Sequence, residues 1–292
     1  MAVPDVTVPD PTVPDPTVPD PTGAIGLVLA RPARLLGVEP FFMEFIAGIE
    51  ERLAERDLSV LLHVVADHDA EIAAYHRWAS RGLVDAVVVV NLVEDDPRPA
   101  VLAELALPAV VVGDSTLPCV RTDHAGPIAS ALDHLLELGH RRIARVTGPS
   151  ALAHTQARTA ALVAGCAAAG VEPVIVEGDY SEESGEKLTT SLLTLADPPT
   201  AILYDNDVMA VSGLAAAVGL GVSVPSQLSL VAWDDSTLCR LASPALTTMS
   251  VDVHQFGVLV AESLLELVDG VPVAERWSPV ARYVPRGTTA AV

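Results

Sequence analysis

Apolar residues along the chain follow two alternating patterns, which predict short buried strands separated by amphipathic helices. Mainly apolar runs, typical of strands covered on both faces, occupy residues 24–30, 58–64, 86–90, 110–112, 117–121, 142–146, 174–176, 201–204 and 228–232. Between these runs apolar residues recur every three or four positions, which predicts helices over 41–55, 69–80, 100–105, 128–138, 155–169, 182–195 and 208–218.

This alternation of strand and helix favours an α/β protein, because right-handed crossovers through helices produce parallel sheets covered on both faces. The alternation forms two series along the chain. We therefore predict two doubly wound parallel-sheet lobes. A chain of 292 residues is long enough to bury a core in each of them.

Polar residues follow two of the predicted strands within residues 199–236. Asp205-Asn206-Asp207 comes directly after the strand over 201–204 and can cap the next helix. Trp233-Asp234-Asp235-Ser236 follows the strand over 228–232. Because ligands of open parallel sheets bind beyond the carboxyl ends of the strands, this stretch predicts a binding edge with an amide, carboxylates and an indole.

The first 22 residues repeat a proline-rich unit, in which VPDVT occurs once and VPDPT three times. Proline fixes φ and removes amide donors, so we predict an extended, disordered tail over residues 1–22. The functional alternative to an unstructured leader is a proline-rich docking tail. Folded sequence is expected to begin near Gly23.

The chain has a formal net charge of −21, to which the tail contributes four aspartates. An acidic chain is a poor partner for a phosphate backbone, so direct DNA binding is not expected. The one basic cluster is Arg141-Arg142-Arg145. We interpret it as the solvated start of a strand.

Cysteine usage and metal-ligating residues indicate neither a disulfide framework nor a metal site. Cys119, Cys166 and Cys239 are widely spaced, which is typical of small core residues in a reducing compartment. The segment 63–69 holds two histidines and two aspartates, but a helix N-cap is the preferred interpretation. No metal and no cofactor are expected. No apolar run reaches the ~18 residues of a membrane helix, and no signal peptide is visible, so we expect a cytoplasmic protein.

A series of short motifs runs through the chain in a fixed order. They are IGL at 25–27, EPFF at 39–42, VRTDHAG at 120–126, ELGHRRIA at 137–144, GDY at 178–180, ESG at 183–185, the stretch 199–236, PALTT at 244–248 and RGTT at 286–289. Their order and spacing together resemble the lactose-repressor/galactose-repressor (LacI/GalR) family of transcription regulators. The resemblance covers roughly residues 24 to 289.

The resemblance implies a two-lobed clamshell like that of type I periplasmic binding proteins, with three crossovers near 121–124, 250–253 and 276–280. We predict an N-terminal lobe of residues 23–122 plus 252–278, and a C-terminal lobe of residues 123–251 plus 279–292. The family's helix-turn-helix and hinge helix are absent, and the repeat stands in their place. The segment 31–38 is longer than the usual family loop. It is expected to lie on the pocket side and therefore to change which ligand binds.

The resemblance also implies which residues contact a ligand between the lobes. Arg158 would donate two hydrogen bonds to neighbouring ligand oxygens; the alternative is that it forms an ion pair on an exposed helix. Asp234 would accept hydroxyl protons, and its burial requires a partner, either the ligand or Arg158. Asn206 matches a polar ligand contact but can also be a helix cap. The remaining predicted contacts are Tyr180, Phe42, His154 and Asp114; Trp233 could border the ligand or lie in the core, and a hinge or cap role is preferred for Asp123-His124.

These features predict a small-molecule sensor, the effector domain of a LacI-type regulator that binds a sugar or similar polar metabolite between its lobes. Binding would change lobe closure. We expect a homodimer through the N-terminal lobe and its helix over 41–55, and DNA contact only through a head domain missing from this chain. The alternatives are a free-standing solute-binding protein and an enzyme on the same scaffold. No phosphate loop or catalytic pair is visible, so no enzymatic activity is expected.

Overall fold

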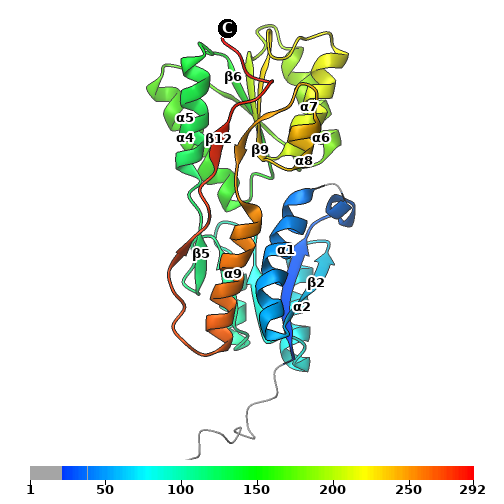
Figure 1. Ribbon diagram of the computed structural model, residues 1–292, viewed down its shortest axis with the longest axis vertical. Coiled ribbons are helices and arrows are strands. Elements are labelled where there is room, and N and C mark those ends of the chain that lie inside the picture. The colour runs from blue at the N-terminus through cyan, green and yellow to red at the C-terminus, as the bar shows by residue number, and fades with distance from the viewer. Residues whose placement is uncertain (1–21, 38) are drawn as a thin grey trace, which may run out of the picture.

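The computed structural model describes residues 22–37 and 39–292, which form two lobes arranged one above the other (Figure 1). Each lobe is built on its own six-stranded sheet. The predicted disorder of the tail concerns residues that, apart from Thr22, lie outside this described part. The α/β class predicted from the strand and helix alternation is confirmed.

The N-terminal lobe contains a sheet of six parallel strands in the spatial order β11-β5-β4-β3-β1-β2. These strands are β1 (Ala24–Ala30), β2 (Ser59–Val65), β3 (Ala86–Val89), β4 (Ala109–Val112), β5 (Cys119–Arg121) and β11 (Arg276–Trp277). Helices α1 (Pro40–Leu53) and α9 (Val253–Val268) cover one face, and α2 (His68–Arg81) and α3 (Arg98–Glu104) cover the other. Two short 3₁₀ helices, η1 (Ala33–Gly37) and η2 (Ala54–Arg56), flank α1.

The C-terminal lobe repeats this plan with the order β12-β10-β9-β8-β6-β7. Its strands are β6 (Ile143–Thr147), β7 (Val174–Glu177), β8 (Ala201–Tyr204), β9 (Ser229–Asp234), β10 (Thr247–Ser250) and β12 (Arg282–Val284). Helices α4 (Ala125–Glu137) and α5 (Ala153–Ala168) cover one face, α6 (Glu182–Leu193) and α7 (Asp207–Gly219) cover the other, and the short α8 (Thr237–Leu241) follows β9. The edge strand β12 is antiparallel to β10, which the prediction of purely parallel sheets did not include.

The chain passes between the lobes three times, after β5, after β10 and after β11. The first two passages occupy residues 122–124 and 251–252, close to the predicted positions. The third lies at 278–281 rather than 276–280, because Arg276 and Trp277 form β11 in the first sheet. We propose lobe boundaries after residues 122, 251 and 278, which all lie within these passages.

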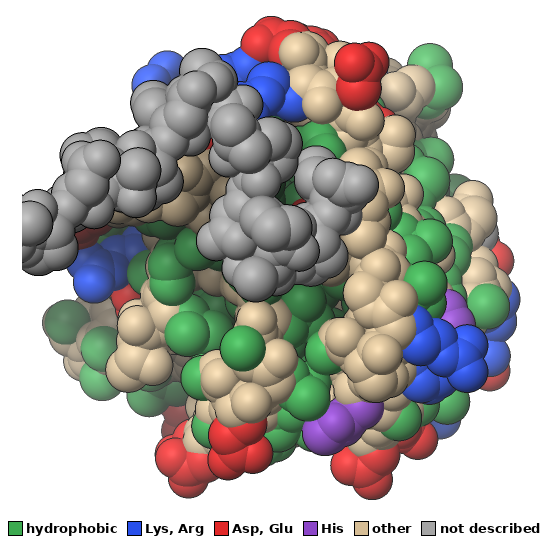
Figure 2. Space-filling view, turned by 90° about the horizontal axis from the view of Figure 1, so that it is seen from below, with side chains coloured by type: hydrophobic (Ala, Val, Ile, Leu, Met, Phe, Trp, Pro, Cys, Tyr) green, Lys and Arg blue, Asp and Glu red, His purple; other side chains and the backbone are tan. Residues whose placement is uncertain are grey.

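The predicted apolar face of α1 is used inside the N-terminal lobe. Its phenylalanines, together with Ile49 and Leu53, pack into a core shared with α9 and the sheet. A dimer contact could therefore use only the outer face of α1, where Met43 is 46% exposed. Seen from the N-terminal lobe's end of the molecule, hydrophobic side chains occupy much of the visible surface, and acidic and basic side chains both lie around its rim (Figure 2).

Candidate functional site

A cavity of about 300 Å³ lies between the lobes, where strands of both sheets end. Asn91 follows β3, Gly113 follows β4 and Thr122 follows β5, and all three line it from the N-terminal side. From the C-terminal lobe, Asp205 and Asp234 line it at the ends of β8 and β9. The carboxyl ends of parallel strands thus meet at one site, as the sequence pattern predicted.

Aromatic side chains make up much of the wall. All four phenylalanines of the chain line the cavity, and three of them lie on the first turns of α1. Phe41 and Phe42 pack edge to face with ring centroids 5.3 Å apart, as do Phe45 and Phe256 at 5.4 Å. Trp233 adds an indole from the other lobe. These rings offer apolar faces that a flat or ring-shaped ligand can cover.

Arg158 lies on α5 with its guanidinium carbon 4.0 Å from the centroid of the Trp233 ring. Stacking on an indole holds the guanidinium group in place and leaves its N–H groups free to donate hydrogen bonds. The Nε group of Arg158 is buried without a hydrogen-bond partner, and Arg158 forms no ion pair with any residue that the structure describes. The alternative of an exposed helical ion pair is therefore wrong. Trp233, left open between core and ligand border, both packs in the C-terminal core and lines the cavity.

Asp234 ends β9 in a left-handed conformation with φ of 83° and lines the cavity. Its carboxylate accepts no hydrogen bond from the residues that the structure describes, so Arg158 is not the direct partner that one of the two alternatives required. Burial raises the pKa of Asp234 well above its usual value, and the negative charge of Asp207 adds to this, while Arg158 partly opposes it. An ionised carboxylate here needs hydrogen-bond donors, which ligand hydroxyl groups could supply.

Tyr180 and His154 form a hydrogen-bonded pair in the wall, with Tyr180 Oη 2.8 Å from His154 Nε2. Burial and the positive charge of Arg158 lower the pKa of His154 to about 3, so this imidazole is neutral. His124 also lines the cavity, and the same two causes lower its pKa to about 4. Its Nδ1 is buried without a partner.

The hinge or cap role preferred for Asp123-His124 is confirmed, because both residues lie in the first passage between the lobes and the Asp123 carboxylate accepts from the N–H groups of Ala125 and Gly126 at the start of α4. In addition, His124 forms part of the cavity wall.

Asn206 is not among the residues that line the cavity. Its side-chain oxygen accepts from Met209 N at 2.9 Å, which confirms the predicted cap of α7, and its amide nitrogen donates to the carbonyl of Tyr180 at 3.0 Å. The neighbouring Asp205 lines the cavity instead. It is paired with the fully buried Arg145 at 2.7 Å. Burial raises the pKa of Asp205, but the positive charges of Arg145 and Arg158, together with hydrogen bonds from Arg145 and from the backbone N–H of Gly148, leave it below its usual value.

The N-terminal lobe contributes two further charged groups that were not among the predicted contacts, although Arg31 belongs to the segment 31–38 that was expected on the pocket side. Arg31 and Glu39 form a buried ion pair, and the guanidinium carbon of Arg31 lies 4.5 Å from the centroid of the Phe42 ring. Burial raises the pKa of Glu39, and Arg31 opposes that shift. Both residues line the cavity, as does Asp114, which is exposed at the rim and pairs with Arg121 at 3.3 Å.

The structure thus brings six of the seven predicted contacts to one cavity. They are Phe42, Asp114, His154, Arg158, Tyr180 and Asp234. Among the residues that the structure describes, no group of three or more His, Cys, Asp or Glu side chains is arranged to hold a metal ion. No helix in the same part of the chain is long and apolar enough to cross a membrane. The arrangement can bind a small ligand through donors, acceptors and aromatic faces drawn from both lobes.

Comparison with known proteins places this geometry in a family. A family model described as a periplasmic binding protein-like domain matches residues 132–289. The HTH-type transcriptional regulator AglR of Rhizobium meliloti is 32% identical over 254 residues, which are 83% of this chain and 70% of that protein.

Solved structures agree with this assignment over nearly the whole chain. A LacI family transcriptional regulator from Bifidobacterium animalis is 35% identical, with a TM-score of 0.85 over 93% of this chain and 99% of that chain. The regulator CelR in complex with cellobiose is 26% identical, with a TM-score of 0.82 over 92% and 85%. The lac repressor dimer bound to operator and an anti-inducer is 27% identical, with a TM-score of 0.81 over 92% and 94%. This chain therefore belongs to the LacI family of transcriptional regulators, and it forms their effector-binding domain.

Proposed function

We propose that the cavity binds a neutral sugar or a similar polyhydroxyl metabolite as the effector. The observation that carries the proposal is a cation and a carboxylate, Arg158 and Asp234, that both line the aromatic cavity and lack partners among the described residues. A sugar supplies oxygens for the guanidinium fork, hydroxyl donors for the carboxylate and an apolar ring face for the aromatic wall. The relative CelR, which was solved with cellobiose, supports the same class of ligand.

The charge balance of the wall favours a neutral ligand over an anionic one. Arg31 pairs with Glu39, and Arg145 pairs with Asp205, so these four charges largely cancel. Of the other charged groups in the wall, Asp114 pairs with Arg121 at the rim and Asp123 accepts hydrogen bonds at the start of α4. Arg158 and Asp234 then remain without partners among the described residues, and Asp207 is a further negative charge close to Asp234. A phosphate or carboxylate ligand would gain from Arg158 but would be repelled by the ionised form of Asp234 and would raise the pKa of that group further. A neutral ligand with both donors and acceptors satisfies both groups.

Ligand contact from both lobes would favour the closed arrangement. Phe42 and Asp114 reach the cavity from the N-terminal lobe, while Arg158, Tyr180 and His154 reach it from the C-terminal lobe. A ligand that touches both sets binds the closed form better and shifts the population towards it. Asn206 then acts from behind the wall, because its amide holds the carbonyl of Tyr180.

We propose further that the protein acts as an isologous homodimer in the cytoplasm and that it contacts DNA through a separate head domain. The lac repressor, which was solved as a dimer bound to its operator and an anti-inducer, supports the dimer. The acidic charge of this chain supports the separation of DNA binding from effector binding, because phosphate binding relies on clusters of Lys and Arg.

A thermal-shift screen of sugars, sugar phosphates and nucleosides identifies the effector. A ligand at a hundred times its Kd should stabilise the protein by about 2.7 kcal/mol. We expect neutral sugars to give the largest shifts. Preferential stabilisation by sugar phosphates would contradict the charge argument.

Substitutions at the two unpartnered charges test the site itself. Arg158→Ala and Asp234→Ala should each weaken the effector found in the screen at least about tenfold, because a charged hydrogen bond is lost. Isothermal titration calorimetry measures the change. Arg240→Ala and Asp197→Ala, which remove exposed charges outside the cavity, are the controls and should leave Kd unchanged. Wild-type affinity in both cavity variants would show that the ligand binds elsewhere.

A further inference from the structure

The loop that follows β3 reaches across from the N-terminal lobe and contacts the C-terminal lobe directly. The carbonyl of Leu92 accepts a hydrogen bond from the backbone N–H of Ala153 at 2.7 Å. The next residue, Val93, forms an isolated antiparallel bridge with Leu152. The side chain of Val93 packs against the hydrophobic core of the C-terminal lobe. This contact is separate from the three covalent passages between the lobes.

The acceptor supplied by Leu92 completes the start of α5. A helix leaves its first N–H groups without partners inside the helix, and a side chain of the capping residue often accepts one of them. The residue in that position here is Leu152, which has no side-chain acceptor, and Ala153 is the first residue of the helix. Its N–H is instead satisfied from the opposite lobe. The first turns of α5 carry His154 and Arg158, so the loop bears on the part of the helix that faces the cavity.

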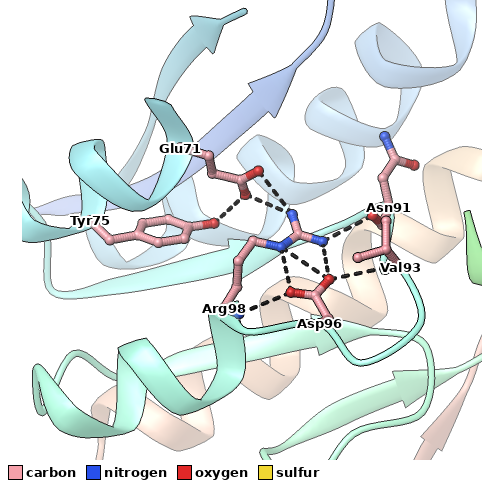
Figure 3. A network of polar contacts seen from close by, with 6 residues as sticks. All are labelled: Glu71, Tyr75, Asn91, Val93, Asp96 and Arg98. Atoms are coloured by element: carbon pink, nitrogen blue, oxygen red, sulfur yellow. Dashed lines mark hydrogen bonds and ion pairs between the residues drawn. The ribbon is translucent and has the colours of Figure 1, made fainter. Parts of the chain in front are cut away.

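A buried network holds the loop in shape (Figure 3). The guanidinium of Arg98, which is 1% exposed, donates to Glu71 at 2.8 and 2.9 Å, to Asp96 at 2.6 and 2.9 Å, and to the carbonyl of Asn91 at 2.9 Å. Asp96 also accepts from the N–H of Val93 at 3.1 Å. The loop is therefore tied at its first, third and last residues. Buried charges that are fully paired resist rearrangement, because losing one partner leaves another charge buried and unpaired.

The same loop forms part of the ligand cavity, since Asn91, Leu92 and Val93 line it. One short segment, residues 91–96, thus lines the cavity, contacts the other lobe and takes part in the buried network. We propose that residues 91–96 act as a latch between the lobes, and that Arg98 is the positioning residue that sets the latch through Asp96 and Asn91. The latch couples the cavity wall to lobe closure whichever ligand the cavity takes.

Amide hydrogen exchange at Ala153, followed by NMR, reports on the latch directly. Asp96→Asn removes a charge that Arg98 requires, while Asp95→Asn makes the same change at the adjacent exposed position, whose carboxylate has no partner among the described residues. In Asp96→Asn we expect the Ala153 amide to exchange at least about tenfold faster. The amides of Val87 in β3 and Cys166 in α5 should keep their wild-type rates. Asp95→Asn should change none of the three.

A second pair of variants distinguishes loss of the interlobe contact from a general destabilisation of the N-terminal lobe. A general destabilisation would also accelerate amide exchange at Val87. Val93→Ala reduces the contact with the other lobe and leaves the Arg98 network intact, while Val60→Ala trims a partly buried valine inside the N-terminal core. We expect Val93→Ala, but not Val60→Ala, to accelerate Ala153 exchange selectively. The latch is refuted if the Ala153 amide exchanges in the wild type like an exposed amide, or if its rate is unchanged in both Asp96→Asn and Val93→Ala.

Discussion

Two arginines three residues apart show how much a single position decides. Arg142 is about half exposed, and its Nε lies 3.1 Å from a carboxylate oxygen of Asp197 at the surface. Arg145, in the middle of β6, is fully buried; its Nη2 lies 2.7 Å from Asp205, and its Nη1 donates to Thr159. The interpretation of the whole basic cluster as solvated was therefore wrong for Arg145. Its charge is matched inside the C-terminal lobe, next to the cavity.

Replacing these arginines should have very different consequences for stability. Arg145→Met leaves Asp205 buried without its cation, so we expect the free energy of unfolding to fall by about 3–5 kcal/mol. Arg142→Met removes an exposed pair and should cost less than about 1 kcal/mol. Urea denaturation monitored by circular dichroism measures both. An equal decrease in the free energy of unfolding in the two variants would mean that the buried ion pair stabilises the protein no more than the exposed one.

At the scale of elements, the crossing of α1 and α9 organises the N-terminal lobe. A Cβ atom at Gly48 would lie 2.0 Å from the carbonyl oxygen of His254, and one at Gly257 would lie 2.1 Å from the carbonyl oxygen of Phe45. The two helices therefore approach backbone to backbone at these glycines. This approach lets α9 cover the apolar face of α1 and brings Phe256 against Phe45 in the cavity wall.

A methyl group at the crossing should force the helices apart. Gly48→Ala is expected to destabilise the protein by about 1–3 kcal/mol, because the atom it would strike belongs to the backbone and has no rotamer to change. Gly219→Ala is the matched control, since this helical glycine at the end of α7 has open space around it. Alanine there should be neutral or stabilising by up to about 1 kcal/mol. Thermal unfolding of both variants tests the difference, and an unaffected Gly48→Ala would argue against the close crossing.

At the scale of the whole molecule, two lobes of similar plan share one cavity and one direct latch. The covering of α1 by α9 removes the helix face that the sequence suggested for dimerisation. Among the described residues, the two edges of the N-terminal sheet are the two-residue strand β11 and the longer strand β2, and Leu61 on β2 is 38% exposed. An exposed edge strand with apolar residues is a ready surface for a second copy.

Sedimentation velocity at micromolar concentration should report about twice the chain mass of 30.4 kDa. Leu61→Glu places a charge on the edge of the N-terminal sheet and should shift the protein towards monomer. Leu241→Glu, which changes a 78% exposed leucine of the C-terminal lobe, should not. A monomer at every accessible concentration would remove the dimer proposal. A dimer that ignores Leu61→Glu but dissociates with Leu241→Glu would move the interface to the other lobe.

The sequence alone determined the order and type of the strands and α-helices from β1 to β9 and the two-lobed plan. The approximate passages between the lobes came from the family resemblance, and the helix α9 and the strands β10 to β12 were not predicted. Strand β1 has the predicted bounds, and Asp67 and Asn206 cap α2 and α7 as their positions indicated. These features depend on apolar periodicity and capping residues, which act over a few neighbouring positions. The ends of the strands follow from the same local signals, whereas the predicted cavity residues followed from the family resemblance.

Only the tertiary structure decided which side chains meet. It turned Asn206 away from the cavity and brought Asp205 into its wall, although both follow β8. It also buried Arg145 and joined Leu92 to Ala153, which is 61 positions later in the chain. Such pairings depend on strand register and on how separate segments pack, and a one-residue change in register reverses the face on which a side chain lies. Local pattern carries no information about these choices, because the partners are far apart in the sequence.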